Sequence, residues 1–222
     1  MINNSSLNYN DSEQFEIVYS DKQISARIRE LAEEISQDYA NKDLVLISML
    51  KGSVHFLSDL SRQISINHLF DFIAIKNRIG DNKGGVIELS RDITIDIEDK
   101  DVLVLEEVVR TGFTTNFMIQ HLERKNPRSI KLAAFLSNPK QMLLDLPLRY
   151  VGFEVSFDRY IGYGLDYKEY GRSLPFIAKL NDNLIQSFTE QSIIENDRRL
   201  NLREKIEQPR WIKGDKEQGY RL

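Results

Sequence analysis

Two adjacent carboxylates and a threonine-rich loop lie within one short stretch of this sequence. Glu106 and Glu107 (the acidic pair) follow an apolar run, and residues 110–115, Arg-Thr-Gly-Phe-Thr-Thr (the threonine loop), precede a helix-like pattern. Backbone N–H groups at a loop entering a helix bind anions, so this loop suits a terminal phosphate. Ionised carboxylates only accept hydrogen bonds, so the acidic pair suits sugar hydroxyls or a cation. Together they predict a phosphorylated ribose with magnesium nearby.

A second candidate anion site follows another apolar run. Residues 50–53, Leu-Lys-Gly-Ser (the lysine-glycine loop), come directly after it. Gly52 permits an unusual peptide geometry, and Lys51 adds a positive charge. This loop suits a second anion such as pyrophosphate.

The elements that position these residues alternate between strand and helix patterns. This alternation predicts an α/β fold with a mainly parallel twisted sheet flanked by helices, whose ligands bind beyond the carboxyl ends of the strands. We expect Asp21 to be the N-cap of the first helix, and residues 76–92 to be a long mobile loop flanking a hairpin. The expected strands are 15–19, 44–50, 70–75, 102–105, 130–136 and 150–155, and the expected helices are 21–39, 54–64 and 114–122.

The domain organisation is predicted from changes in composition along the chain. The 222 residues suit one domain with an appendage. We expect residues 1–12, which are rich in Asn and Ser, to be disordered, residues 13–180 to form the domain, and residues 181–222 to be a charged helical extension.

Composition excludes several classes of function. The formal charge of -4 argues against nucleic-acid binding. Without cysteine the chain has neither disulfides nor thiolate metal sites. We expect no secretory signal, and no apolar run approaches the roughly 20 residues of a membrane span. The expected location is the cytoplasm.

From about residue 14 to 180 the chain resembles the type I phosphoribosyltransferases, and most closely their hypoxanthine-guanine branch. The acidic pair with the threonine loop resembles the family's phosphoribosyl diphosphate motif, and the lysine-glycine loop resembles its pyrophosphate loop. The segment VGFEVSFDRYIGYGLDYKEYGR, residues 151–172 (the signature segment), resembles the family's base-binding and carboxy-terminal signature. The resemblance implies the type I fold, including a small hood region.

The resemblance also implies a role for individual residues. The acidic pair would hold the ribose 2′- and 3′-hydroxyls, directly or through Mg²⁺. Asp166 would hold a second Mg²⁺ through water. The 5′-phosphate would be wrapped, mainly by backbone amides, by Thr111, Gly112, Phe113, Thr114 and Thr115. Pyrophosphate would be contacted by Lys51, Gly52 and Arg172.

The implied reaction joins 5-phosphoribosyl 1-diphosphate to a nitrogen base or another small acceptor. Pyrophosphate would leave ribose C1 through a transition state that resembles an oxocarbenium ion, so positioning and neutralisation of the leaving group would dominate catalysis. The family resemblance further implies a homodimer or homotetramer.

The base side departs from the family pattern at three positions. Arg110 replaces an aspartate thought to take or share the purine ring proton, and arginine is no general base at neutral pH. Asn138 replaces a lysine that recognises the purine 6-oxo group. Arg159, with Tyr160 beside it, replaces a stacking aromatic. We therefore expect altered base specificity, with Arg110 and Arg159 receiving an acidic group on the acceptor, or with Arg110 turned back onto the phosphate.

Three functions are compatible with these residues. The first is a magnesium-dependent phosphoribosyltransferase with altered base specificity. The second is a catalytically silent regulatory protein that binds phosphoribosyl diphosphate or a nucleotide. The third is an ordinary hypoxanthine enzyme that tolerates the changes, in which Arg110→Asp would alter the rate little.

Overall fold

The computed structural model describes residues 15–79, 85–156, 159–182, 184–186 and 188–189. The predicted disorder of residues 1–12 lies outside them. The residues through Leu180 belong to one compact unit, and those from Asn181 onward belong to a second, whose described residues include short helical pieces. No helix in the described ranges has the length and apolar character needed to span a membrane.

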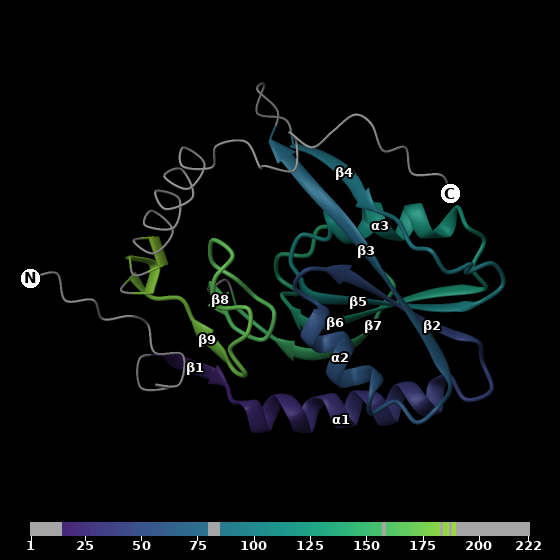
Figure 1. The fold of residues 1–222 in the computed structure, drawn as a ribbon, viewed down its shortest axis with the longest axis horizontal. Helices are drawn as coiled ribbons and strands as arrows, with labels where there is room; N and C mark the ends of the chain where they lie inside the picture. The colour runs from purple at the N-terminus through teal and green to yellow at the C-terminus, as the bar shows by residue number, and fades with distance from the viewer. Residues whose placement is uncertain (1–14, 80–84, 157–158, 183, 187, 190–222) are drawn as a thin grey trace, which may run out of the picture. The chain divides into compact units, whose positions relative to one another are not determined.

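The first unit is built on a six-stranded sheet with the order β4-β3-β2-β5-β6-β7. All neighbours in it are parallel except the β3–β4 pair, which confirms the predicted mainly parallel sheet (Figure 1). The strands are β2 (Leu44–Leu50), β3 (His68–Ile79), β4 (Gly85–Arg91), β5 (Asp101–Val109), β6 (Ser129–Ser137) and β7 (Leu148–Glu154).

Alternating side chains of the central strands feed two hydrophobic cores. Leu44 and Leu46 of β2 pack with α1 (Asp21–Asp38) and α2 (Val54–Ser61) in one core. Val45 and Ile47 pack with α3 (Phe113–Glu123) in the other. Strand β5 divides in the same way, because successive side chains of a strand point to opposite faces of the sheet.

The start of α1 differs from the prediction by one residue. The N-cap is Ser20, not Asp21: the Ser20 side chain accepts a hydrogen bond from the Gln23 N–H, and the Gln23 side chain accepts one from the Ser20 N–H. This reciprocal arrangement satisfies two backbone donors, and Asp21 then lies in the first turn, where a carboxylate is favourable.

Residues 76–92 are more regular than predicted. Strand β3 continues to Ile79, and β4 returns antiparallel to it from Gly85 to Arg91. The expected hairpin is therefore present, but strand residues occupy most of the segment that was expected to be a long loop. The residues between the two strands, 80–84, lie outside the described ranges.

A second, three-stranded antiparallel sheet forms a small hood with the order β1-β9-β8. Its strands are β1 (Glu16–Tyr19), β8 (Tyr160–Ile161) and β9 (Ile177–Lys179). Strand β1 was expected from the sequence, whereas β8 and β9 are too short to produce an alternating pattern. The segment between β8 and β9 contains Asp166 and Arg172, so the hood positions part of the predicted site.

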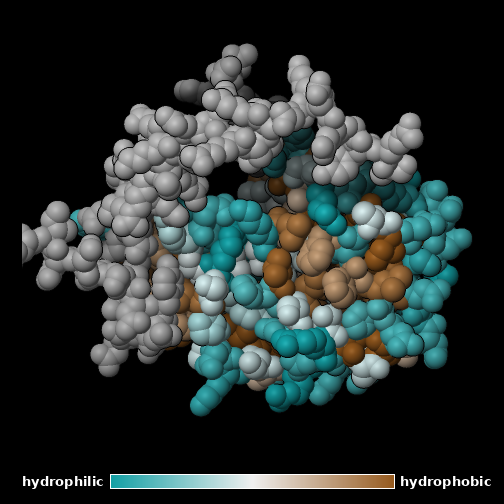
Figure 2. Space-filling model, in the orientation of Figure 1, coloured by the Kyte–Doolittle hydropathy of each residue, from teal (hydrophilic) through white to brown (hydrophobic). Residues whose placement is uncertain are grey.

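Apolar residues gather on one exposed face, over α2 and the neighbouring strands β2 and β3 (Figure 2). Val54 of α2 and Phe70 of β3 are large exposed side chains on the α2 side of the sheet, because Phe70 is paired with Leu46, which packs with α2. Such a patch is typical of a surface that contacts another protein.

Candidate functional site

The acidic pair lies inside β5, not after it. The sequence predicted that the strand ends at Leu105, but β5 continues to Val109 and pairs with β6 as far as Ser137. Because strand side chains alternate, the two carboxylates point to opposite faces of the sheet. Glu106 lies on the α3 side and Glu107 on the side of α2.

Glu106 is enclosed by the protein. Only 1% of the residue is exposed, and its Oε1 accepts a hydrogen bond from Thr115 Oγ1 at 2.9 Å. Burial raises the pKa of Glu106 to about 8, against the opposing effect of the Thr115 hydrogen bond. The Thr115 hydroxyl is thus committed to Glu106, which leaves only the backbone N–H of Thr115 for a phosphate.

Glu107 lies against the lysine-glycine loop. A Cβ on Gly52 would overlap the Glu107 carboxylate, so only glycine admits this side chain. Burial raises the pKa of Glu107 to about 7; Arg172 opposes the rise, and the charge of Asp166 adds to it. The sheet edge therefore brings together residues from β5, the lysine-glycine loop and the signature segment.

A network of ion pairs joins the two sequence segments predicted to bind pyrophosphate. Lys51 Nζ lies 2.7 Å from Glu169 Oε2, and Arg172 Nη2 lies 2.6 Å from Asp166 Oδ1 and 3.5 Å from Glu169 Oε2. Arg172 Nη1 also donates to the Gly164 carbonyl at 2.9 Å. The Leu50–Lys51 peptide is cis. Two cations thus converge on the Glu169 carboxylate, an anion that holds them side by side.

The threonine loop leads into α3 through a left-handed residue. Gly112 is the N-cap with φ 88°, a conformation that favours glycine. Its carbonyl accepts the Asn116 N–H at 2.8 Å, but its lack of a side chain means that no side chain caps the first turn. The N–H groups of Phe113 to Thr115 therefore face outward at the positive end of the α3 dipole, which suits an anion.

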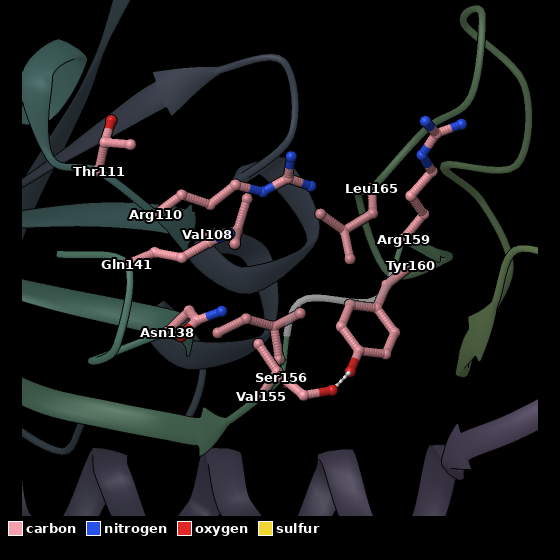
Figure 3. A pocket seen from close by; sticks show the side chains of 11 residues that line it. Val108, Arg110, Thr111, Asn138, Gln141, Val155, Ser156, Arg159, Tyr160 and Leu165 are labelled. Carbon is pink, nitrogen blue, oxygen red and sulfur yellow. Dashed lines mark hydrogen bonds between the residues drawn. The ribbon is translucent and has the colours of Figure 1, made fainter.

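A pocket of about 270 Å³ opens beside this loop, at the ends of β5, β6 and β7 (Figure 3). It brings together all the residues predicted for the base side: Arg110, Asn138, Arg159 and Tyr160. Arg110 extends from the end of β5 toward Leu165, rather than back toward Thr111 (Figure 3). Tyr160 forms a hydrogen bond with Ser156 at 3.2 Å, so its hydroxyl is fixed. The remaining lining residues are Val108, Thr111, Leu136, Gln141, Ser156, Val155 and Leu165.

Three buried polar atoms, two beside the lysine-glycine loop and one in the pocket, have no hydrogen-bond partner among the described residues. They are Glu107 Oε2, Arg172 Nε and Asn138 Nδ2. A buried polar atom without a partner costs about 1–3 kcal/mol, so most buried polar atoms in proteins are paired. These atoms are therefore candidates for contact with a ligand.

The carboxylates fit a magnesium ion only together with a ligand. Among the described residues, no group of three or more His, Asp or Glu side chains is arranged to hold a metal ion. Mg²⁺ usually binds through one or two carboxylates plus substrate phosphates. Glu107 has a carboxylate oxygen without a partner, and the charge of Asp166 raises its pKa. These two carboxylates therefore fit a Mg²⁺ ion that also binds substrate phosphates. Glu106 points to the other side of the sheet.

Sequence reasoning missed two contributors to the site. Glu169 bridges Lys51 and Arg172, and its position three residues from both Asp166 and Arg172 was an available signal. Gly164, with φ 102°, brings the signature segment onto the lysine-glycine loop, since a Cβ there would overlap the Gly52 carbonyl. The apolar pocket walls were also not foreseen, because they come from four separate segments.

Fold and site together define a class. Residues 14–168 match the model of the phosphoribosyl transferase domain, which is more than half of the chain. The chain belongs to the phosphoribosyltransferase family, a family of enzymes.

Individual relatives agree with this assignment. A hypoxanthine-guanine phosphoribosyltransferase of Mycobacterium bovis is 36% identical over 177 residues, covering 77% of this chain and 88% of the relative. Another from Dictyostelium discoideum is 36% identical, covering 75% of this chain and 96% of the relative. The crystal structure of a hypoxanthine phosphoribosyltransferase from Staphylococcus aureus matches with a TM-score of 0.72 and 31% identity, covering 76% of this chain and 92% of that one.

Proposed function

We propose that this protein is a Mg²⁺-dependent phosphoribosyltransferase that binds 5-phosphoribosyl 1-diphosphate and transfers the phosphoribosyl group to a nitrogen base other than hypoxanthine or guanine. The observation that carries the proposal is the position of Glu107. Its unpartnered oxygen lies between the lysine-glycine loop and Arg172, at the sheet edge where the threonine loop enters α3. A carboxylate beside two candidate anion-binding loops and an arginine suits a phosphorylated ribose that carries a pyrophosphate group.

Each part of the donor has a proposed set of contacts. The free N–H groups at the start of α3 would bind the 5′-phosphate. Glu107 would accept hydrogen bonds from ribose hydroxyls, while Glu106 would act from the opposite face by holding Thr115 and thus the loop. Lys51 and Arg172 would turn from Glu169 to pyrophosphate, exchanging one anion for another.

Magnesium would be held by Glu107 and Asp166 together with oxygens of the donor. When bound, it neutralises charge on the departing pyrophosphate. The residues of the chain then hold the donor so that ribose C1 faces the pocket, and Arg172 adds a second positive charge on the leaving-group side. Displacement at C1 breaks the bond to pyrophosphate and forms the bond to the acceptor nitrogen.

The names of the relatives point to hypoxanthine and guanine, but the base pocket here argues for another acceptor. Arg110, Asn138 and Arg159 line it. An arginine cannot remove a proton from the acceptor at neutral pH, so the attacking nitrogen must either lose its proton to solvent or carry none. The lack of a general base at position 110 also favours the second candidate, a catalytically silent regulatory protein that binds the donor without turnover.

Titration with the donor separates these functions. Calorimetry with 5-phosphoribosyl 1-diphosphate and Mg²⁺, run beside a pyrophosphate-release assay over a set of bases, should show binding and release with at least one acceptor. Binding without release for any acceptor would favour the regulatory protein. Release with hypoxanthine alone would mean that Arg110 is tolerated in an ordinary purine enzyme.

Assembly and location are further parts of the proposal. The exposed apolar residues Val54 and Phe70 on the α2 side support a homodimer or homotetramer, which sedimentation would test. A cytoplasmic location remains a prediction from the sequence.

A further inference from the structure

Among the described residues, the base pocket offers hydrogen-bond donors but no carboxylate. None of the described lining residues is Asp or Glu, and residues 157 and 158 lie outside the described ranges. Arg110 and Arg159 both line it and are exposed, and within the described part of the chain neither forms a salt bridge within 4.0 Å. The Arg110 charge lowers the pKa of Glu107, against the dominant effect of burial, so Arg110 also acts on the neighbouring acidic pair. Two cations beside one pocket, with neither paired to an acid among the described residues, attract an anion.

A further donor lies deeper in the pocket. Asn138 is only 3% exposed, and its Nδ2 has no partner among the described residues. An amide nitrogen of this kind requires an acceptor such as a ring carbonyl or ring nitrogen. A ligand that left it unpaired would be rejected, because the cost of the unpaired group would remain.

The other walls of the pocket are apolar and come from separate segments of the chain. Val108, Leu136, Val155 and Leu165 line it, and Tyr160 is buried beside them with its hydroxyl bonded to Ser156 (Figure 3). Apolar walls with a few placed donors are the usual lining of a site for a small flat molecule. The polar groups then fix which molecule it is.

From these observations we infer that the acceptor is a flat nitrogen heterocycle that carries a carboxylate, with the carboxylate toward Arg110 and Arg159 and a ring acceptor toward Asn138. This inference rests on the proposed transferase function and names its substrate class. The arginine guanidinium matches the geometry of a carboxylate and binds it with two parallel hydrogen bonds. A neutral oxopurine offers no carboxylate and would leave both exposed guanidinium groups to water.

The inferred acceptor also explains why the site needs no general base at position 110. The ring nitrogen that attacks C1 must bring an electron pair while the C1–oxygen pair leaves with pyrophosphate. A ring with an acidic N–H loses its proton to solvent beforehand, and a pyridine-type nitrogen has no proton to lose. In both cases the bond changes balance without a proton acceptor at position 110.

Two matched pairs of rings provide the test, since each pair differs only in the anionic group. We would titrate the full chain, with Mg²⁺ and 5-phosphoribosyl 1-diphosphate present, with orotate and uracil, with nicotinate and nicotinamide, and with hypoxanthine. The expected result is about tenfold or more tighter binding of the carboxylated member in at least one pair, as for a hydrogen-bonded charge. Pyrophosphate release should accompany the same member.

Three variants locate the preference. Arg110→Gln and Arg159→Gln should each reduce the preference for the carboxylated ring about tenfold, with little change in binding of its neutral partner. Arg29→Gln removes an exposed arginine of α1 outside the pocket and should leave the preference unchanged.

The possible failures are distinguishable. Equal binding within both pairs, a preference that survives in both pocket variants, or tightest binding of hypoxanthine would overturn the inference while the donor still binds. Loss of donor binding itself, measured first without any acceptor, would overturn the proposed function and this inference with it.

Discussion

The proposed phosphoribosyl side and the proposed base side of this site lie at the same edge of one sheet but are built differently. On the proposed phosphoribosyl side, backbone geometry shapes the site: Gly52 makes room for Glu107, and Gly112 opens the start of α3. On the proposed base side, single side chains at strand ends line the pocket, namely Arg110 and Asn138. The first kind of site is hard to alter without harming the fold, whereas the second can change specificity by one residue at a time.

Gly52→Ala should have the largest effect on the phosphoribosyl side. The added Cβ would overlap the Glu107 carboxylate and force it out of place. Displacing a buried carboxylate from its contacts costs about 3 kcal/mol, so Mg²⁺-dependent binding of 5-phosphoribosyl 1-diphosphate should weaken about 100-fold in calorimetry. Ser58→Ala, at an exposed position of α2, is the control of similar size. Unchanged affinity in a folded Gly52→Ala protein would mean that Glu107 does not contact the donor.

Arg110→Asp should change the base side far more than the phosphoribosyl side, where the Arg110 charge is only the last of the four effects on the pKa of Glu107. It supplies a proton acceptor for a neutral purine, and general base catalysis is worth about 100-fold or more, although Asn138 and Arg159 remain unfavourable. Hypoxanthine-dependent pyrophosphate release should therefore rise by about tenfold or more. Arg110→Gln, which removes the charge without adding a base, should produce no such rise. An unchanged rate in Arg110→Asp would show that position 110 does not govern the acceptor.

Donor affinity should depend on pH through Glu107. Burial raises its pKa to about 7, so the side chain is mostly protonated at pH 6 and mostly ionised at pH 8. Only the ionised form accepts both hydroxyl and cation contacts, so affinity should rise about tenfold over this range. Glu107→Gln should flatten the part of the rise that the donor phosphates do not cause.

The stability of the unliganded protein should move in the opposite direction. The pKa of Glu107 is about 7 in the folded protein and 4.5 ordinarily, so the folded state holds a proton that the unfolded state has lost. The free energy of unfolding therefore falls as the pH rises from 4.5 to about 7. Thermal unfolding should therefore occur at a lower temperature at pH 7 than at pH 5, and less so in Glu107→Gln. A Glu107→Gln protein with the same pH dependence as the unaltered chain would contradict this assignment.

Glu169→Gln should have the smallest effect. The Glu169 carboxylate pairs with Lys51 and Arg172 in the unliganded protein, and the Lys51 hydrogen bond lowers its pKa. Exposed ion pairs contribute little, so freeing the two cations should tighten pyrophosphate binding only about twofold to fivefold. Glu123→Gln, an exposed position on α3, is the matched control. Weaker binding in Glu169→Gln would mean that Glu169 positions the cations for the anion rather than competing with it.

The sequence predicted most of the sheet, because its central strands are continuous apolar runs. Residues Leu44 to Leu50 form β2 as expected. The prediction of β5 was wrong at its end, because the apolar run stops at Leu105 while the strand continues to Val109. Strand β5 continues through the acidic pair because pairing with β6 outweighs the low strand preference of glutamate. That error hid the fact that the two carboxylates face opposite ways.

The site was predictable as a set of segments but not as a set of contacts. The threonine loop, the lysine-glycine loop and the signature segment each have recognisable local chemistry. The contact of Glu107 with Gly52 and the bridge from Lys51 to Glu169 depend on how those segments fold together. No local pattern of one sequence determines such long-range pairs.

The most direct test of the central claim is donor titration of the unaltered protein and of Arg110→Asp, each followed by pyrophosphate release with hypoxanthine. If the phosphoribosyl side is intact and the base side altered, both proteins bind 5-phosphoribosyl 1-diphosphate with Mg²⁺ to a similar extent, and only Arg110→Asp releases pyrophosphate with hypoxanthine at an appreciable rate. Fast release by the unaltered protein, or failure of both proteins to bind the donor, would contradict the account.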